Sequence, residues 1–271
     1  MTAGSVSLRR ELRAGWSLFR RDMLKFQRER ARIVSSLMQP ILFLGIFGLG
    51  LKNVLGGTGP FQDIDYIQYI FPGVIGINVL GISMSTGVTI VADREFGFLR
   101  EVLVAPISRV TIALGKVASG VATAMFQVAI LLLLSPLLGL TPGIIQIVLL
   151  MAAVALLATA TSALGVLMAS RIRSVETFQY VFQFALFPLF FLSGAFFVLD
   201  RVPLWIAVIA KLNPLTYAID LFRHILYADI ELGDVTRELL LVNTPAENVL
   251  IIALISVVLL TASVVSFARM E

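Results

Sequence analysis

Six long apolar stretches leave few folds open to this sequence. They lie near residues 33–51, 68–92, 112–134, 144–169, 178–198 and 248–267. Each is close to the roughly 20 residues that a helix needs to cross the hydrocarbon core of a bilayer. Hydrophobic residues make up 58% of the chain, and a soluble domain of 271 residues has too little interior to bury so much apolar surface. The alternating segments of an outer-membrane barrel are missing from the sequence. We therefore predict an all-α membrane protein with six transmembrane helices.

The distribution of lysine and arginine predicts the orientation of these helices. Nine basic residues precede the first stretch, and an inside N-terminus places 16 of the 21 basic residues on the inner side. Such a bias marks the cytoplasmic face of a membrane protein. We expect a multi-pass protein of the cell (inner) membrane with both termini in the cytoplasm. The net charge of +4 then fits loops beside anionic lipid, and not nucleic-acid binding.

Several kinds of chemistry lack their residues in this sequence. There is no cysteine and only one histidine, so disulfides, thiol chemistry and a histidine metal cluster are excluded. Gly115-Lys116 lacks the rest of a phosphate-binding loop, and no serine or zinc protease motif occurs. The centres of the six stretches contain no acidic residue, which disfavours an ion-coupled pump. We expect no catalytic site, metal or cofactor in this chain.

The first 32 residues predict a cytoplasmic amphipathic helix, separate from a six-span domain over residues 33–269. Apolar residues recur at steps of three and four along one helical stripe. They are Leu8, Leu12, Trp16, Phe19, Met23 and Phe26. Arginines occupy the other faces, so the helix suits the surface of an anionic inner leaflet. Contact with a cytoplasmic partner is compatible with the same arrangement.

The inner loop from Asp93 to Pro106 carries a second amphipathic pattern. Phe96, Leu99 and Leu103 fall on one helical face, charged residues fall on the other, and Pro106 ends the helix. A solvated loop with salt bridges is the alternative interpretation.

The outer segment from Leu192 to Leu226 is too apolar for an ordinary loop. Pro203 and Pro214 can each begin a helix, with Asn213 as the N-cap of the second. The two helices either dip into the outer leaflet without crossing it or form a compact cap above the membrane. Hydropathy alone does not separate these alternatives.

Polar residues within two of the spans indicate either a lined path or helix packing. Gln179 and Gln183 lie one turn apart on the aromatic fifth span, where lipid would disfavour them. In the second span, Gly81 and Ser85 lie four residues apart near Asn78, a spacing that is more typical of helix packing.

Two segments carry a resemblance to a known family. One runs from Asp93-Arg94-Glu95-Phe96-Gly97-Phe98-Leu99-Arg100-Glu101 through Ala105-Pro106-Ile107-Ser108-Arg109 to Gly115-Lys116. The other runs from Leu192-Ser193-Gly194-Ala195-Phe196-Phe197 through Val202-Pro203-Leu204-Trp205 to Asn213-Pro214-Leu215-Thr216-Tyr217-Ala218. In both segments the sequence resembles the membrane subunit of type-2 ABC exporters, a group that includes daunorubicin-resistance, nodulation and polysaccharide export permeases.

The resemblance implies a division of labour between subunits. Two copies of a cytoplasmic ABC ATPase would bind ATP and Mg²⁺, and two permeases, expected to be a homodimer, would form the path through the membrane. The cargo would be lipophilic or amphipathic (a drug, lipid or glycolipid), and its export would fit multidrug or antibiotic resistance. A membrane scaffold or sensor without transport activity is the alternative function.

The resemblance also assigns roles to residues of this chain. Spans two and five would line the path. The helix that couples to the ATPase would contain Asp93, Arg94, Glu95, Phe96, Gly97, Leu99, Arg100, Glu101 and Leu103. The interface helix would present Trp16, Phe19, Met23 and Phe26 to the membrane. The outer cap would be built on Gly194, Pro203, Trp205, Asn213, Pro214 and Tyr217. The path lining would include Asn78, Gly81, Ser85, Gln179, Gln183 and Phe187.

Overall fold

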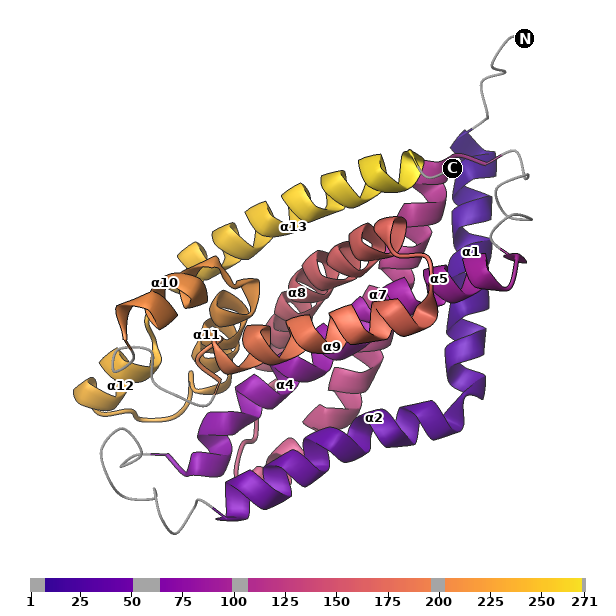
Figure 1. Cartoon of the computed structure of the whole chain (residues 1–271). Coiled ribbons are helices and arrows are strands. Elements are labelled where there is room, and N and C mark those ends of the chain that lie inside the picture. Colours follow the sequence, from indigo (N-terminus) through magenta and orange to yellow (C-terminus); the bar gives the residue numbers. More distant parts are fainter. Residues whose placement is uncertain (1–7, 51–63, 99–106, 196–202, 270–271) are drawn as a thin grey trace, which may run out of the picture.

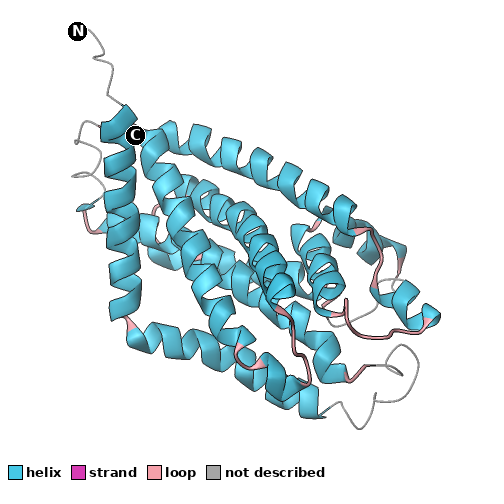
Figure 2. Ribbon diagram, turned by 180° about the vertical axis from the view of Figure 1, so that it is seen from behind, coloured by secondary structure: helices cyan, strands magenta, loops and turns pink. Residues whose placement is uncertain are grey.

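The structure is a computed structural model that describes residues 8–50, 64–98, 107–195 and 203–269. Within these residues it contains helices and connecting loops and no strand (Figure 2). The helices are α1 (Leu8–Arg28), α2 (Arg30–Phe43), α4 (Tyr66–Met84), α5 (Thr86–Glu95), α7 (Arg109–Leu132), α8 (Ile144–Arg171), α9 (Val175–Phe191), α10 (Leu204–Leu212), α11 (Pro214–Leu226), α12 (Asp234–Leu240) and α13 (Pro245–Ala268). A π-helical turn extends α2 over Leu44–Leu49, and a 3-10 turn lies at Ser135–Leu138. The all-α prediction is confirmed.

Four helices in the described ranges are long and apolar enough to cross a membrane. They are Tyr66–Glu95, which joins α4 and α5, Arg109–Leu132, Ile144–Arg171 and Pro245–Ala268. The first and fifth predicted spans correspond to the shorter apolar helices Ile33–Ile46 and Val175–Phe191. The chain is therefore a membrane protein, and six crossings remain a prediction.

Helix α8 lies at the centre of the bundle and packs against α4, α5, α7, α11 and α13 (Figure 1). Glycines permit the closest approaches between these helices. A methyl group at Gly165 would meet the Met84 carbonyl oxygen at 2.5 Å, and one at Gly87 would meet the Gly165 carbonyl oxygen at 2.5 Å. Small residues at helix contacts are typical of membrane bundles. The small residue that we expected at such a contact, Gly81, has no neighbouring atom within 4 Å of an added methyl group.

A proline inside α4 opens a hydrogen-bonding position that is filled from the neighbouring helix α11. Pro72 has no N–H, so the carbonyl of Gln68 loses its helical donor. The hydroxyl of Tyr227, which follows α11, donates a hydrogen bond of 2.9 Å to that carbonyl. The backbone defect is thereby repaired by a side chain from a distant segment.

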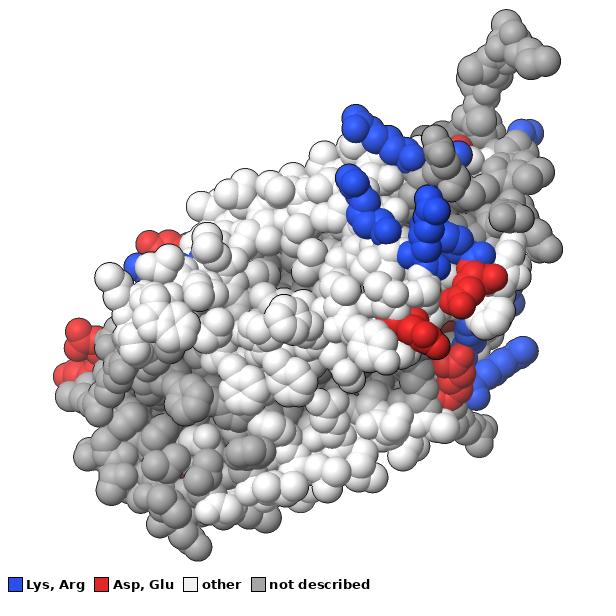
Figure 3. All heavy atoms as spheres, viewed as in Figure 1, with Lys and Arg blue, Asp and Glu red and all other residues white. Residues whose placement is uncertain are grey.

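The two ends of the bundle carry different elements. The first turn of α1 and the last turn of α13 lie at one end, and α10, α11 and α12 lie at the other (Figure 1). Charged side chains gather mainly at the α1 end, with a smaller group at the α12 end and an uncharged band between them on the face in Figure 3. A protein whose middle faces hydrocarbon has this distribution.

Two sequence predictions about helices need correction, and one helix was not predicted. The N-terminal helix does not continue to Arg32, because Glu29 leaves the helical region (φ −82, ψ 60) and separates α1 from α2. The helix predicted from Asp93 to Pro106 is wrong at its start, because α5 ends at Glu95 and Gly97 adopts a left-handed conformation (φ 81). The short helix α12 was not predicted.

Candidate coupling end and transport path

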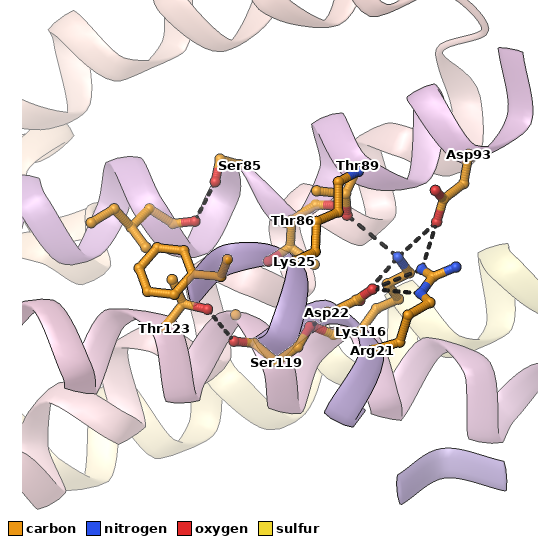
Figure 4. Close-up of a pocket in the computed structure, with 13 residues that line it drawn as sticks. Arg21, Asp22, Lys25, Ser85, Thr86, Thr89, Asp93, Lys116, Ser119 and Thr123 are labelled. Carbon is orange, nitrogen blue, oxygen red and sulfur yellow. Dashed lines mark hydrogen bonds and ion pairs between the residues drawn. The ribbon is translucent and has the colours of Figure 1, made fainter. Parts of the chain in front are cut away.

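Four charged side chains from three helices form a cluster at the α1 end of the bundle (Figure 4). Lys116 of α7 is 2% exposed, and its Nζ lies 3.0 Å from a carboxylate oxygen of Asp22 in α1 and 2.9 Å from one of Asp93 in α5. Arg21 contacts the same two carboxylates at 2.7 and 2.9 Å. A buried charge requires such partners, because an isolated one would cost several kcal/mol. The cluster therefore holds α1, α5 and α7 together.

A small polar cavity of about 50 Å³ adjoins this cluster. Hydroxyl groups of Ser85, Thr89 and Thr123 line it, and each donates its proton to a backbone carbonyl of its own helix. The Thr89 oxygen also accepts a hydrogen bond of 3.5 Å from Lys116, and the space suits a few water molecules. Asp93 and Ser85 were predicted as functional residues, but not as members of one site with Asp22 and Lys116. The available signals were the lone lysine within an apolar span, Lys116, and the acidic residue Asp22 within an arginine-rich helix.

The carboxylate of Glu11 caps the start of α7. It accepts hydrogen bonds from the Ser108 N–H (2.9 Å), the Ser108 hydroxyl (3.0 Å) and the Thr111 hydroxyl. These bonds, the Thr111 bond foremost, lower the pKa of Glu11 below its ordinary value although burial opposes them. A negative charge also interacts favourably with a helix N-terminus. Helix α1 is thus fixed to the beginning of α7.

The face of α1 that packs against α7 combines charged, small and apolar residues. Glu11, Gly15, Asp22 and Phe26 follow one another along it. A methyl group at Gly15 would approach the Thr111 side chain to 3.2 Å, so the two helices cross closely here. At the far end of α1, the ring of Phe26 packs edge-on against the ring of Phe126 in α7, with 5.9 Å between the ring centres.

The predicted apolar stripe of α1 is only partly buried. Phe26 is buried, Phe19 and Met23 are half-buried, and Leu12 and Trp16 are 66% and 64% exposed. We expected the stripe to meet the membrane. In the structure its outer residues stay uncovered by the chain, because the neighbouring face makes the contacts with α7.

The last turn of α5 is tied to the α8–α9 connection. Arg94 donates hydrogen bonds to the carbonyls of Ile172 and Ala169 at 2.9 and 3.1 Å, at the C-terminal end of α8. Glu95 accepts a hydrogen bond of 3.2 Å from the N–H of Val175 at the start of α9. The positive charge of Arg94 is favourable at the C-terminal end of α8, and the negative charge of Glu95 is favourable at the N-terminal end of α9. A movement of this turn must therefore displace α8 and α9 as well.

The residues after α5 present an aromatic side chain to the outside. Phe96 is 84% exposed and precedes the left-handed Gly97. The guanidinium of Arg21 lies 4.5 Å from the centre of the Phe98 ring, which anchors the segment to α1. The remaining predicted coupling residues lie outside the described part of the chain; they are Leu99, Arg100, Glu101 and Leu103.

Buried amides lie between α2, α4 and α7. Pro40 in α2 frees the carbonyl of Ser36, and Asn78 of α4 donates a hydrogen bond of 3.4 Å to it. The amide of Gln127 in α7 donates to the Ser36 hydroxyl. The side-chain oxygens of Asn78 and Gln127 are buried and have no hydrogen-bond partner in the part of the chain that the structure describes. Asn78 therefore faces α2 and α7.

The predicted path residues do not share one face of the chain. Ser85 lines the cavity beside α1, whereas Gln179, Gln183 and Phe187 are exposed on α9. Exposed glutamines are costly against lipid, so the α9 face is better suited to contact with protein or a polar path.

The predicted boundary between the two outer helices is confirmed. Asn213 caps α11, its amide donates to the Leu189 carbonyl at 2.5 Å, and Pro214 is the first residue of the helix. Pro214 has no N–H that could donate to the Ala210 carbonyl. The Thr216 hydroxyl donates a hydrogen bond of 2.8 Å to that carbonyl instead. The turn joining α10 and α11 is thus fully bonded.

The other predicted cap residues differ in burial. Pro203 and Trp205 are exposed at the start of α10, and the hydroxyl of Tyr217 donates to the Lys211 carbonyl at 2.7 Å. Gly194 has φ 75 and follows the end of α9. The carbonyl of Gly194 accepts a hydrogen bond from a residue that was not predicted as part of the cap.

That residue is Arg223 of α11, which is buried. It donates to the Gly194 carbonyl at 2.8 Å, and its guanidinium lies 4.5 Å from the centre of the Tyr69 ring. Its Nε has no hydrogen-bond partner among the described residues. Among the described residues, the Tyr69 ring, the Gly194 carbonyl and Tyr227 therefore take the place of the carboxylate that a buried arginine usually has.

Asp220 is a second buried charge of α11. Its carboxylate accepts hydrogen bonds from the backbone N–H groups of Val242 and Asn243 at 3.1 and 2.9 Å and from the Asn248 amide at 2.8 Å. These bonds join α11 to the start of α13. The outer helices are therefore anchored to the bundle at both sides of α11.

Comparison with known proteins agrees with this architecture. Residues 13–227 match the family described as ABC-2 type transporter. The protein named transport permease ycf38 in Porphyra purpurea is 30% identical over 215 residues, which cover 77% of this chain and 72% of the relative. The inner membrane transport permease YadH of Escherichia coli is 28% identical over 197 residues, 70% of this chain and 75% of the relative. YbhR of Escherichia coli, named as a multidrug ABC transporter permease, is 26% identical over 179 residues, 65% of this chain and 48% of the relative.

Proposed function

Because this chain belongs to the ABC-2 type transporter family and is a membrane permease of an ABC transporter, we propose that it forms the transmembrane part of an exporter. The exporter moves a lipophilic or amphipathic compound (a drug, lipid or glycolipid) out of the cytoplasm or the inner leaflet. A separate ATPase subunit binds ATP and Mg²⁺ and supplies the energy. The permease itself acts as a lever and a path, and carries out no chemical step.

The coupling part of the proposal rests on the hydrogen bonds by which Arg94 and Glu95 of α5 hold α8 and α9. Both side chains bind the α8–α9 connection, and the preceding residue, Asp93, belongs to the Lys116 cluster. A push on the segment after α5 is thereby transferred to α1, α7, α8 and α9 together. The exposed Phe96 provides the contact that a groove in the ATPase surface would receive.

Helix α1 completes the ATPase-facing end. Its Glu11 and Asp22 hold it to α7, while Leu12 and Trp16 stay exposed. We assign this exposed stripe to the inner membrane surface, where the arginines on the other faces of α1 meet anionic lipid. In this arrangement, α1 keeps its position while the neighbouring helices respond to the ATPase.

A second permease covers the exposed face of α9. Gln179 and Gln183 would be unfavourable in hydrocarbon, and the aromatic side chains Tyr180, Phe184 and Phe187 offer a large contact area beside them. Two copies of this chain facing each other through α9 would place these residues along a shared path. Aromatic walls suit a lipophilic or amphipathic cargo, in keeping with the multidrug wording in the name of YbhR.

Helices α10 and α11 close the path at the outer end. They lie opposite the α1 end and are fixed by Asn213, Asp220 and Arg223. We assign them to the outer leaflet, where they re-enter without crossing.

The experiment that tests the proposal is co-expression with an ABC ATPase from the same gene neighbourhood. The complex should purify with both subunits, and lipophilic compounds from a panel of drugs, lipids and glycolipids should stimulate its ATPase activity. Phe96→Asp should reduce stimulation or assembly, whereas Arg171→Gln, an exposed change at the same end of the bundle, should leave both unchanged. Purification of a stable permease that binds no ATPase would favour a scaffold instead.

A further inference from the structure

A cavity with two lobes lies at the outer end of the molecule, between α11, α12 and the start of α13. The inner lobe has a volume of about 260 Å³, and the outer lobe about 410 Å³. Both lobes are lined by His224, Arg237 and Leu241, so they adjoin each other. These volumes are close to the lower limit of the volumes that are typical of small-molecule binding sites. The outer helices and the path do not account for this cavity.

Among the described residues, the inner lobe is lined by positive charge and by no carboxylate. Its polar side chains are Arg237 and His224, because the Tyr227 hydroxyl that also borders it is directed to the Gln68 carbonyl. Nε2 of His224 donates a hydrogen bond of 2.7 Å to a backbone carbonyl, which leaves Nδ1 as the other polar atom of the ring. Asp229, which is close in sequence, accepts from an amide of α8 instead.

Arg237 is the charged group that the two lobes share. Within the described part of the chain its side chain makes no ion pair, although α12 carries two acidic residues next to it. A guanidinium presents several donors in one plane, and it matches the oxygens of a phosphate or carboxylate.

The outer lobe has the opposite character. Asp234 and Glu238 of α12 and Glu247 of α13 border it together with Arg237. Glu247 uses one carboxylate oxygen to cap α13, at 2.9 Å from the Thr244 N–H. Asp234 and Glu238 leave an excess of negative charge at the mouth. The cavity therefore changes from basic inside to acidic outside over the length of a small molecule.

We propose that this cavity binds a zwitterionic ligand of the phosphoethanolamine type. The phosphate lies in the inner lobe against Arg237 and His224, and the ammonium lies in the outer lobe among the carboxylates. A purely anionic ligand would meet the acidic mouth, and a purely cationic one would meet Arg237. The ligand is either the headgroup of a lipid in the outer leaflet or a free zwitterion. The binding site is independent of the proposed transport function.

The test uses the purified full-length chain in dodecyl maltoside without zwitterionic lipid. Calorimetry compares glycerophosphoethanolamine with glycerophosphoglycerol, which keeps the phosphate and lacks the ammonium. Glycerophosphoethanolamine should bind at least about tenfold more tightly, since a charge-assisted hydrogen bond contributes that much. Arg237→Gln and Glu238→Gln should each weaken its binding by about the same factor, whereas Arg171→Gln at the opposite end should not.

Dihexanoyl phosphatidylethanolamine separates the two sources of the ligand. Tighter binding of this short-chain lipid than of glycerophosphoethanolamine identifies a lipid headgroup, and equal binding identifies a free zwitterion. Thermal unfolding shows that the variants are folded, which is expected because Arg237 and Glu238 are exposed. Equal affinity of the two glycerophosphodiesters, unchanged binding in Arg237→Gln, or no binding of either the diester or the lipid would overturn the proposal.

Discussion

Replacing Lys116 by methionine tests whether the charge cluster holds α1 to the bundle. Methionine fills nearly the same space, so the packing of α7 is preserved while the charge is lost. Lys116 is 2% exposed, and the two carboxylates it contacts are 13% and 14% exposed. Without Lys116, Asp22 and Asp93 share Arg21 alone, which is 33% exposed.

The expected loss of stability is about 3 kcal/mol. Removal of one partner from a buried ion pair costs about 3–5 kcal/mol, and the lower value applies because Arg21 still compensates part of the charge. Asp22→Asn should cost less, about 1.5 kcal/mol, since Lys116 keeps Asp93. The double variant should cost at least about 1 kcal/mol less than the sum of the single variants, because the two residues interact directly.

The assay is the free energy of SDS-induced unfolding in mixed micelles. Lys25→Met is the matched control: it removes a lysine that borders the same cavity but is exposed, and it should change stability by less than about 0.5 kcal/mol. Lys116→Arg should retain more stability than Lys116→Met because it keeps the charge. Equal stability of Lys116→Met and the wild type, or strict additivity with Asp22→Asn, would refute the role of the cluster.

Four further predictions concern other contacts. The pKa of Glu11 lies below its ordinary value of 4.5, so the contribution of Glu11 to the docking of α1 is fully present above pH 4.5. This contribution is lost as the pH falls through the lowered pKa. Trp16 fluorescence should report this pH dependence, and Glu11→Gln should remove it. Asp220→Asn should lower stability by about 2 kcal/mol in SDS titrations, since it weakens several hydrogen bonds to one buried carboxylate. Arg223→Met should lose the Gly194 bond, and hydrogen exchange at the end of α9 should increase. Phe96→Asp should leave stability unchanged in the same titrations and act only on the ATPase partner, because Phe96 is exposed.

Hydropathy and turn signals predicted much of the helical architecture. The apolar stretches correspond to helices, and the Asn213-Pro214 boundary follows from local preferences that need no tertiary information. The break at Gly97 was missed because a helical period was extended across a glycine, which adopts a left-handed conformation easily.

The charge cluster could not be predicted in the same way. Asp22, Asp93 and Lys116 belong to three helices that are distant in sequence, and their proximity depends on how α1 crosses α7. The contacts of α1 with α7 were not predicted either, because Glu11 and Asp22, which make them, lie beside the apolar stripe. Hydrophobic periodicity identifies the face that avoids water, but in a membrane protein lipid can cover that face while small and charged residues make the helix contacts.

In the proposed function, an ATPase drives cargo through this permease. The most direct measurement is ATP-dependent movement of a lipophilic compound in proteoliposomes that contain the purified permease and its ATPase. With the ATPase on the outside, the account predicts accumulation of the compound inside the vesicles, which requires ATP and is lost in Phe96→Asp. ATP hydrolysis by an intact complex that moves none of the compounds stimulating it, or movement that is independent of ATP, would contradict the account.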